Sequence, residues 1–109
     1  MSATPITVWT ELQQLADAAC EHFKLHMARL EPIVSPRLRC FGDCDFDAAS
    51  PSIRLRVHQL NRPSQPLARQ TIIDTLAHEL AHLAHSRHGR KHLAMRRDIL
   101  TFWKENQWI

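Results

Sequence analysis

The chain has 109 residues, of which 44% are hydrophobic and 23% charged, and its formal net charge is +3. This length and apolar content suit one modest core, so we expect a single domain over residues 1–109 and no second folding unit. A run of about 20 apolar residues is lacking, as is a basic N-terminal region followed by an apolar run, which argues against a membrane span and a secretory signal and predicts a cytoplasmic protein.

The first predicted element is an amphipathic helix that starts near Thr10 and runs toward Glu31. Residues 10–13 (TELQ) resemble a capping box, which satisfies backbone groups at a helix start. Pro32 and Pro36 then stop the helix. The apolar positions that repeat at helical spacing are Leu12, Leu15, Ala19, Phe23 and Leu30.

Two short strands are predicted next, at residues 38–41 and 53–58, with a turn-rich connection over residues 43–52. We expect them to form a short antiparallel sheet. The second strand alternates apolar and polar residues, which indicates one buried face. The residues expected to point inward are Ile53, Leu55 and Val57, and those expected to point outward are Arg54, Arg56 and His58.

A second amphipathic helix is predicted from Leu67 to Ser86, and Pro63 and Pro66 suit a start just before it. Its apolar and polar residues gather on opposite sides, so the helix should bury one face and present the other to a cleft. The apolar set is Ile72, Ile73, Leu76, Leu80 and Leu83, and the polar set is Asp74, His78, His82 and His85.

A last helix is predicted after Gly89. It offers Leu93, Ile99, Leu100 and Trp103 as core contacts against the first helix. A helix, a short sheet and two further helices in this order predict a small α+β domain.

The run His78-Glu79-Leu80-Ala81-His82 within the second helix is the H-E-x-x-H signature of zinc hydrolases. Side chains four residues apart share a helix face, so both imidazoles can reach one Zn²⁺ while Glu79 takes a proton from a water beside the metal. With this histidine-rich composition, roughly 0.03 occurrences of H-E-x-x-H are expected by chance in the whole chain. The amphipathic pattern around the motif makes a chance occurrence less credible still. The alternative is a solvated, histidine-rich helix face.

Zinc enzymes usually hold the metal with three protein ligands, so a third ligand is expected. His88 ranks first, because Gly89 after it would let the chain turn and return an imidazole over the metal. His92 is second by reach, and Glu105 would be a ligand from a later helix. His85 shares the helix face but lies about 7.5 Å along the axis from the midpoint of the histidine pair, out of reach on an unbroken helix.

Two other groupings contain metal-binding residue types. Cys40 and Cys44 could belong to a second metal site, but two further ligands at suitable spacing are lacking, which favours a buried or turn-flanking thiol pair. His22 and His26 lie one turn apart, but without a third ligand or a neighbouring carboxylate they are interpreted as surface polar residues. The cysteines number three, which argues against a disulfide scaffold and agrees with a reducing compartment.

Residues 75–82 (TLAHELAH) followed by residues 88–92 (HGRKH) resemble the SprT-like metallopeptidase family, and the related YgjP-like proteins also match. Those families place a strand with an Ile-Arg-Leu type sequence before the motif helix, and residues 52–55 (SIRL) are similar to it. The resemblance covers roughly residues 38–103. It implies a single small zincin-like domain and a zinc metalloendopeptidase activity.

The resemblance also implies site residues. It makes His78, His82 and His88 the ligands of one Zn²⁺ per chain, and Glu79 the general base that activates the attacking water. The aromatic residue that these families carry four positions beyond the third ligand is replaced here by His92. This departure either weakens a packing contact or adds a polar group to the site.

Charge is uneven along the chain, since residues 1–47 carry a net charge of −3 and residues 48–109 carry +6. The basic half could steer an anionic partner such as nucleic acid, although a solvated helix face explains it equally well. Spartan-type relatives act on DNA–protein crosslinks, so the resemblance implies a protein or peptide substrate, with DNA-associated proteins as candidates. The rival interpretation is a non-catalytic, zinc-stabilised module that binds nucleic acid or protein. The basic residues near the proposed third ligand are Arg87, Arg90, Lys91, Arg96 and Arg97.

Further roles around the metal are assigned by analogy. Many zinc peptidases use a tyrosine or histidine to stabilise the oxyanion, and since the chain has no tyrosine, His58, His85 or His92 would serve. Asp74, one turn before the first motif histidine, is a candidate acceptor for a ligand imidazole, with a solvent-exposed position as the alternative. The strand at residues 53–58 is expected at the sheet edge beside the cleft, where an extended substrate would pair with its backbone.

Overall fold

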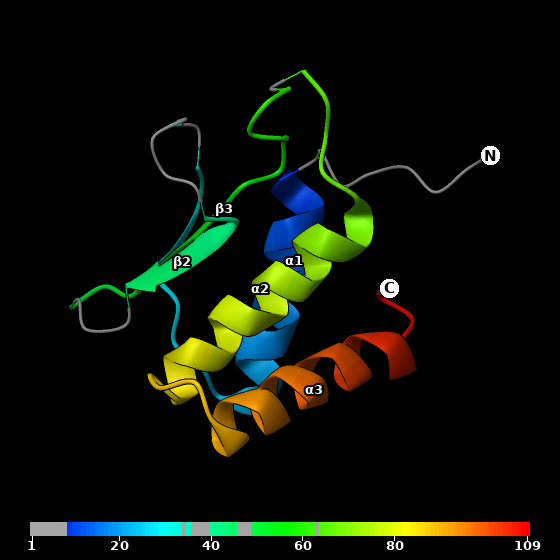
Figure 1. Cartoon of the computed structure of the whole chain (residues 1–109). Coiled ribbons are helices and arrows are strands. Elements are labelled where there is room, and N and C mark those ends of the chain that lie inside the picture. Colours follow the sequence, from blue (N-terminus) through cyan, green and yellow to red (C-terminus); the bar gives the residue numbers. More distant parts are fainter. Residues whose placement is uncertain (1–8, 34, 36–39, 46–48, 63) are drawn as a thin grey trace.

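The computed structural model describes residues 9–33, 35, 40–45, 49–62 and 64–109. Within them the chain forms three helices and a three-stranded sheet, which confirms the α+β class (Figure 1). The elements are α1 (Trp9–Phe23), β1 (Arg29–Pro32), β2 (Gly42–Asp45), β3 (Ser52–Leu55), α2 (Arg69–Ala84) and α3 (Arg90–Glu105). α2 contacts α1, α3, β2 and β3, so the sheet and the other helices meet on it. None of the described helices is both long and apolar enough to cross a membrane.

α1 ends at Phe23, well before the predicted end near residue 31. Lys24 adopts a left-handed conformation with φ 59°, and the Leu25 N–H donates to the Cys20 carbonyl at 2.9 Å. This is the pattern of a helix end with a left-handed residue after the last turn, a place usually taken by glycine. Because a lysine stands there, the sequence gives no stop signal, and the last part of the predicted helix is wrong. The chain forms β1 instead.

The sheet is mixed: the expected antiparallel pairing is present between β2 and β3, and β1 adds a parallel strand that the sequence does not predict. β3 is the central strand and pairs with β1 in parallel, with Ile53 opposite Leu30, and with β2 antiparallel, with Ile53 opposite Cys44. The predicted edge position of β3 is wrong, because β3 has a neighbour on each side. The edge strand that contacts α2 is β2.

β2 forms where the sequence predicts a turn. Of the strand predicted at residues 38–41, residues 38 and 39 lie outside the described residues, and Cys40 and Phe41 form a bend. The Asp43 carboxylate on β2 pairs with the Arg54 guanidinium on β3, and the Arg54 Nε to Asp43 Oδ1 distance is 2.9 Å. Such cross-strand ion pairs support a sheet, but a pattern read along one segment cannot show them.

The alternation predicted for the strand at residues 53–58 is confirmed on its apolar side, because all three inward positions are buried. His58 is exposed, as predicted. Arg56 differs, since it is only 5% exposed. Its guanidinium donates to the carbonyls of Ser35 at 2.8 Å and Cys40 at 3.2 Å, so backbone of the segment before β2 satisfies this buried cation.

α3 buries one stripe that contains His92, Ile99 and Trp103. The Trp103 indole N–H donates to the Leu15 carbonyl of α1 at 2.9 Å, which confirms the predicted contact with the first helix. Leu93 is predicted to lie in the core but is 47% exposed. It lies about 100° around the helix from His92, which takes the buried position instead.

Candidate metal centre

α2 carries the first part of the site. Its apolar stripe is buried as predicted, except for the half-buried Leu83, and this packing fixes the helix against the core. Burying each such aliphatic side chain contributes about 1.5–3 kcal/mol to the free energy of unfolding. On the polar side, His78 and His82 lie one turn apart and Glu79 follows His78 directly.

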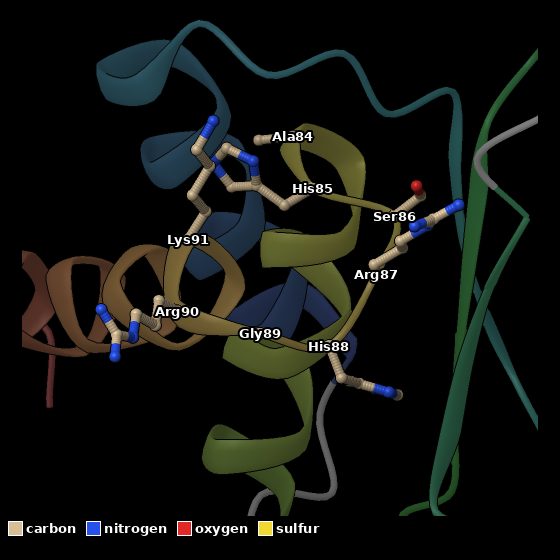
Figure 2. Close-up of a pocket in the computed structure, with 8 residues that line it drawn as sticks. All are labelled: Ala84, His85, Ser86, Arg87, His88, Gly89, Arg90 and Lys91. Atoms are coloured by element: carbon tan, nitrogen blue, oxygen red, sulfur yellow. The ribbon is translucent and has the colours of Figure 1, made fainter.

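A loop after α2 returns His88 to the same helix. α2 ends at Ala84, and His85 is extended with φ −136° and ψ 104°, so the chain leaves the helix there. Gly89 has φ 175°, an extended conformation open to any residue, so the return does not depend on a turn at the glycine as the sequence suggests. Figure 2 shows the His88 ring pointing away from the side of the loop that holds the His85 side chain.

The Nε2 atoms of the three predicted ligands converge. Their separations are 3.2 Å for His78 and His82, 3.0 Å for His82 and His88, and 3.1 Å for His78 and His88. Three nitrogens in mutual contact cannot all form hydrogen bonds, because each presents either a proton or a lone pair and at least two must be alike. Two imidazoles bound to one tetrahedral zinc at 2.0–2.1 Å bring their nitrogens to about 3.3–3.4 Å. The donors and their spacing therefore fit a metal ion such as zinc.

The hydrogen bonding and the pKa shifts of His78 and His82 also suit metal binding. The His82 Nδ1–H donates to the His85 carbonyl at 3.2 Å, which leaves the lone pair on Nε2. Burial lowers the pKa of His78 to about 4, and positive charge on the neighbouring histidines and on Arg96 adds to the fall. Burial likewise lowers the pKa of His82. Both shifts favour the neutral imidazole, the form that binds metal ions.

His92 joins the same cluster from α3. A group of four histidines, His78, His82, His88 and His92, has ligand atoms within 4.8 Å of one another and could hold a metal ion. His92 is 4% exposed, its Nε2–H donates to the His78 carbonyl at 2.9 Å, and its ring centroid lies 4.2 Å from that of His82. The imidazole thus keeps a packing contact and adds a hydrogen bond between α3 and α2. In this geometry its Nε2 is engaged by the carbonyl.

Glu79 is a buried carboxyl, 6% exposed, beside the histidines. Burial raises its pKa to about 7, and the negative charge of Asp43 adds to the rise. A carboxyl with a pKa near the working pH can both accept and return a proton. This environment suits the role of general base that the sequence predicts.

Gly42 lets β2 approach α2 beside Glu79. A Cβ on Gly42 would lie 2.7 Å from Thr75 Cγ2, 3.0 Å from the Arg54 carbonyl oxygen and 3.2 Å from Glu79 Cγ. The first of these distances is shorter than side chains tolerate, so any larger residue would push the edge strand away from the helix. The sequence does not single out Gly42, because its contacts come from residues distant along the chain.

We expect Gly42→Ser to lower the free energy of unfolding by about 1–3 kcal/mol, because the added side chain overpacks the contact between β2 and α2. The matched control is Gly89→Ser, since a Cβ at Gly89 would meet nothing within 4 Å and serine suits the start of a helix. Chemical denaturation of both variants measures the difference. Equal stability of the two variants would contradict the close approach at Gly42.

Other predicted candidates lie apart from the cluster. Glu105 ends α3 and lies about 20 Å along the helix axis from His92, too far for one ion. His22 stacks on Phe102 with a centroid distance of 4.2 Å and belongs to that contact. Asp74 accepts a hydrogen bond from Gln70 at 2.8 Å, and no described contact joins it to a motif histidine.

The cysteine pair and His58 contribute nothing to the described site. In the part of the chain that the structure describes, the four-histidine cluster is the only group of three or more metal-binding side chains, so Cys40 and Cys44 form no second centre. Burial raises the pKa of Cys44 to about 12, which makes this thiol unreactive. His58 is exposed and pairs with Pro66 in an isolated bridge.

Two hollows adjoin His78. The smaller, which we call the Glu79 pocket, has a volume of about 270 Å³ and is lined by Phe41, Gly42, Asp74, Thr75, His78, Glu79 and Arg96. The larger, which we call the α3 pocket, has a volume of about 560 Å³ and is lined by His78, His88, Gly89, Arg90, His92, Leu93 and Arg96. Arg96 lines both pockets. The sequence does not reveal this position, because in the sequence Arg96 is only one of several basic residues near His88.

A third hollow lies on the loop itself. It has a volume of about 420 Å³ and is lined by residues 84–91, which include the cations Arg87, Arg90 and Lys91 (Figure 2). The loop and the first turn of α3 therefore present positive charge next to His88.

The pattern that defines the WLM domain matches residues 49–108. The chain belongs to the WLM domain family. No curated protein sequence matches this WLM chain significantly. The relationship to SprT-like and YgjP-like proteins in particular stays a prediction.

Two solved structures share the fold of this WLM chain. The crystal structure of Wss1 from Saccharomyces cerevisiae superposes with a TM-score of 0.73 at 18% identity, covering 89% of this chain and 77% of that one. The crystal structure of a Wss1 mutant from the same organism gives a TM-score of 0.74 at 17% identity, covering 98% of this chain and 88% of that one. At these identities the likeness shows a common fold.

Proposed function

We propose that this WLM protein is a zinc metalloendopeptidase of the H-E-x-x-H type. One Zn²⁺ per chain is held by His78, His82 and His88, and Glu79 is the general base. The observation that carries the proposal is the convergence of three Nε2 atoms at 3.0–3.2 Å next to a buried carboxyl. The resemblance to SprT-like peptidases in the order and spacing of these residues supports it.

The chemistry divides between the metal and the chain. Bound zinc would supply a Lewis acid that polarises the peptide carbonyl and acidifies a water. Glu79 accepts the proton of the attacking water and returns it to the leaving amine, which its pKa of about 7 permits near neutral pH. The His85 carbonyl keeps the His82 lone pair on Nε2, and the hydrogen bond from His92 to the His78 carbonyl holds α3 against the site.

We propose that the substrate is a protein segment in extended conformation. In the described sheet β2 pairs with β3 on one side only, and Gly42 at its start lines the pocket that contains Glu79. A substrate backbone could pair with this edge and bring a peptide bond to the carboxyl. Proteins associated with DNA are candidate substrates, because the cations of the loop and of the first turn of α3 beside His88 suit an anionic surface.

Metal removal tests the activity. We expect the protein to hydrolyse dye-labelled casein, to lose this activity after treatment with a chelator, and to regain it with zinc but not with magnesium, because imidazole ligands favour zinc. The control is elemental analysis of the chelated sample. Hydrolysis that persists in metal-free protein would contradict a zinc peptidase, and a zinc-bound protein without hydrolysis would favour the non-catalytic binding module.

A further inference from the structure

The α3 pocket adjoins two of the three converging imidazoles, those of His78 and His88. Its other wall is the start of α3, where Arg90, Leu93 and Arg96 follow one another at spacings of three residues and so share one helix face. At about 560 Å³ the pocket can admit a substrate side chain. A side chain bound there would lie beside the peptide bond that the site cleaves.

The charge of this pocket has one sign. Two arginines line it and no aspartate or glutamate does, whereas the neighbouring Glu79 pocket contains Asp74 and Glu79. Arg96 is half-buried, and within the described chain it has neither a hydrogen bond nor an ion pair. By contrast, Arg54 pairs with Asp43 and Arg69 pairs with Glu11 at 2.6 Å. Arg96 is therefore a cation available to a ligand at the junction of both pockets.

We propose that the α3 pocket binds a carboxylate side chain of the substrate through Arg96, with Arg90 assisting, so that the enzyme prefers an aspartate or glutamate next to the cleaved bond. The inference rests on the proposed peptidase function. Its chemistry is that of an arginine fork, which donates two parallel hydrogen bonds to a carboxylate. The exposed Leu93 between the two cations offers the methylene groups of the same side chain an apolar contact.

The preference can be measured with matched peptides. A position-scanning peptide library, screened by binding to zinc-loaded Glu79→Gln protein, first locates the substrate position at which the side chain has the largest effect. The value of kcat/KM is then compared for peptides with glutamate or isosteric glutamine at that position. We expect the glutamate peptide to be favoured by about 10- to 100-fold, the range of a charged hydrogen bond formed out of bulk water. Arg96→Met should abolish the preference, and Arg96→Lys should retain part of it.

Arg97→Met is the matched control, since Arg97 is the exposed neighbour on α3 and lines neither pocket. It should leave the glutamate preference of the wild type unchanged. An equal fall in kcat/KM for both peptides in Arg96→Met would indicate a general structural role and overturn the proposal. So would wild-type protein that cleaves both peptides equally well.

A binding measurement separates this inference from the proposed function. Fluorescence anisotropy of the two labelled peptides with zinc-loaded Glu79→Gln protein should show tighter binding of the glutamate peptide, and Arg96→Met in that background should remove the difference. This readout decides the inference even if the wild type cleaves nothing, a result that would count against the peptidase function alone. If Arg96→Met weakens binding of a single-stranded DNA oligonucleotide and leaves the peptide difference intact, the pocket is a phosphate site and the proposal fails.

Discussion

Glu79→Gln should reduce turnover by about 10²- to 10⁴-fold, the usual contribution of a general base, while zinc stays bound. The change replaces one carboxyl oxygen with an amide nitrogen of similar size, so packing against β2 persists. The amide cannot accept the proton of the attacking water. Hydrolysis of dye-labelled casein and metal analysis of the same sample measure both effects. Full activity in this variant would contradict the role of Glu79 and would favour the non-catalytic module.

The stability of the same variant provides an independent control. The Glu79 carboxyl binds its proton more tightly in the folded chain, where its pKa is about 7, than in the unfolded chain, where its pKa has the ordinary value of 4.5. In metal-free wild type, deprotonation of Glu79 therefore lowers the free energy of unfolding as the pH rises from about 4.5 through about 7. Glu79→Gln lacks this fall, so metal-free variant protein should be at least as stable as wild type at pH 8. A clearly less stable variant would indicate that lost activity reflects damaged folding.

The motif helix is the part of the fold that the sequence predicts best. Its apolar stripe and histidine face are both encoded within one segment, and the expected helix from Leu67 to Ser86 corresponds to α2 at Arg69–Ala84. His88 is predicted from the turn expected at Gly89; the structure brings His88 to the pair of motif histidines, although Gly89 itself is extended. These inferences succeed because they depend on residues close together in the chain.

The wrong predictions concern elements whose structure depends on contacts between distant residues or on unusual backbone conformations. A left-handed lysine ends α1 without a glycine to mark it, and the partners of β2 and β3 are set by pairing across the sheet. His92 displaces Leu93 from the buried stripe of α3 because the imidazole packs against the histidine cluster and donates to a carbonyl of α2. A hydrophobic pattern cannot show that a polar ring takes the core position.

Two residues of the site also cannot be predicted from sequence patterns. Gly42 matters through its contacts with α2, and Arg96 through its place between two pockets. Neither belongs to the motif, and neither has a neighbour in sequence that would mark its role. Both depend on how β2 and α3 pack on either side of α2.

His88→Ala should remove bound zinc, because two imidazoles alone hold the ion far more weakly than three. The Nε2 atoms of His78, His82 and His88 form a triangle with sides of 3.0–3.2 Å, so we expect each of the three proposed ligands to be needed for tight binding. Glu105→Ala is a control for the alternative ligand on α3, and His92→Phe tests whether His92 serves as a ligand or only packs. We expect both of these variants to retain the metal.

The most direct measurement is the zinc content of untagged wild type and these three variants, by mass spectrometry after dialysis. We expect about one zinc per chain in wild type, Glu105→Ala and His92→Phe, and nearly none in His88→Ala. Loss of zinc in Glu105→Ala with retention in His88→Ala would replace the proposed ligand set. Wild-type protein that holds no zinc even after reconstitution would contradict the metallopeptidase itself.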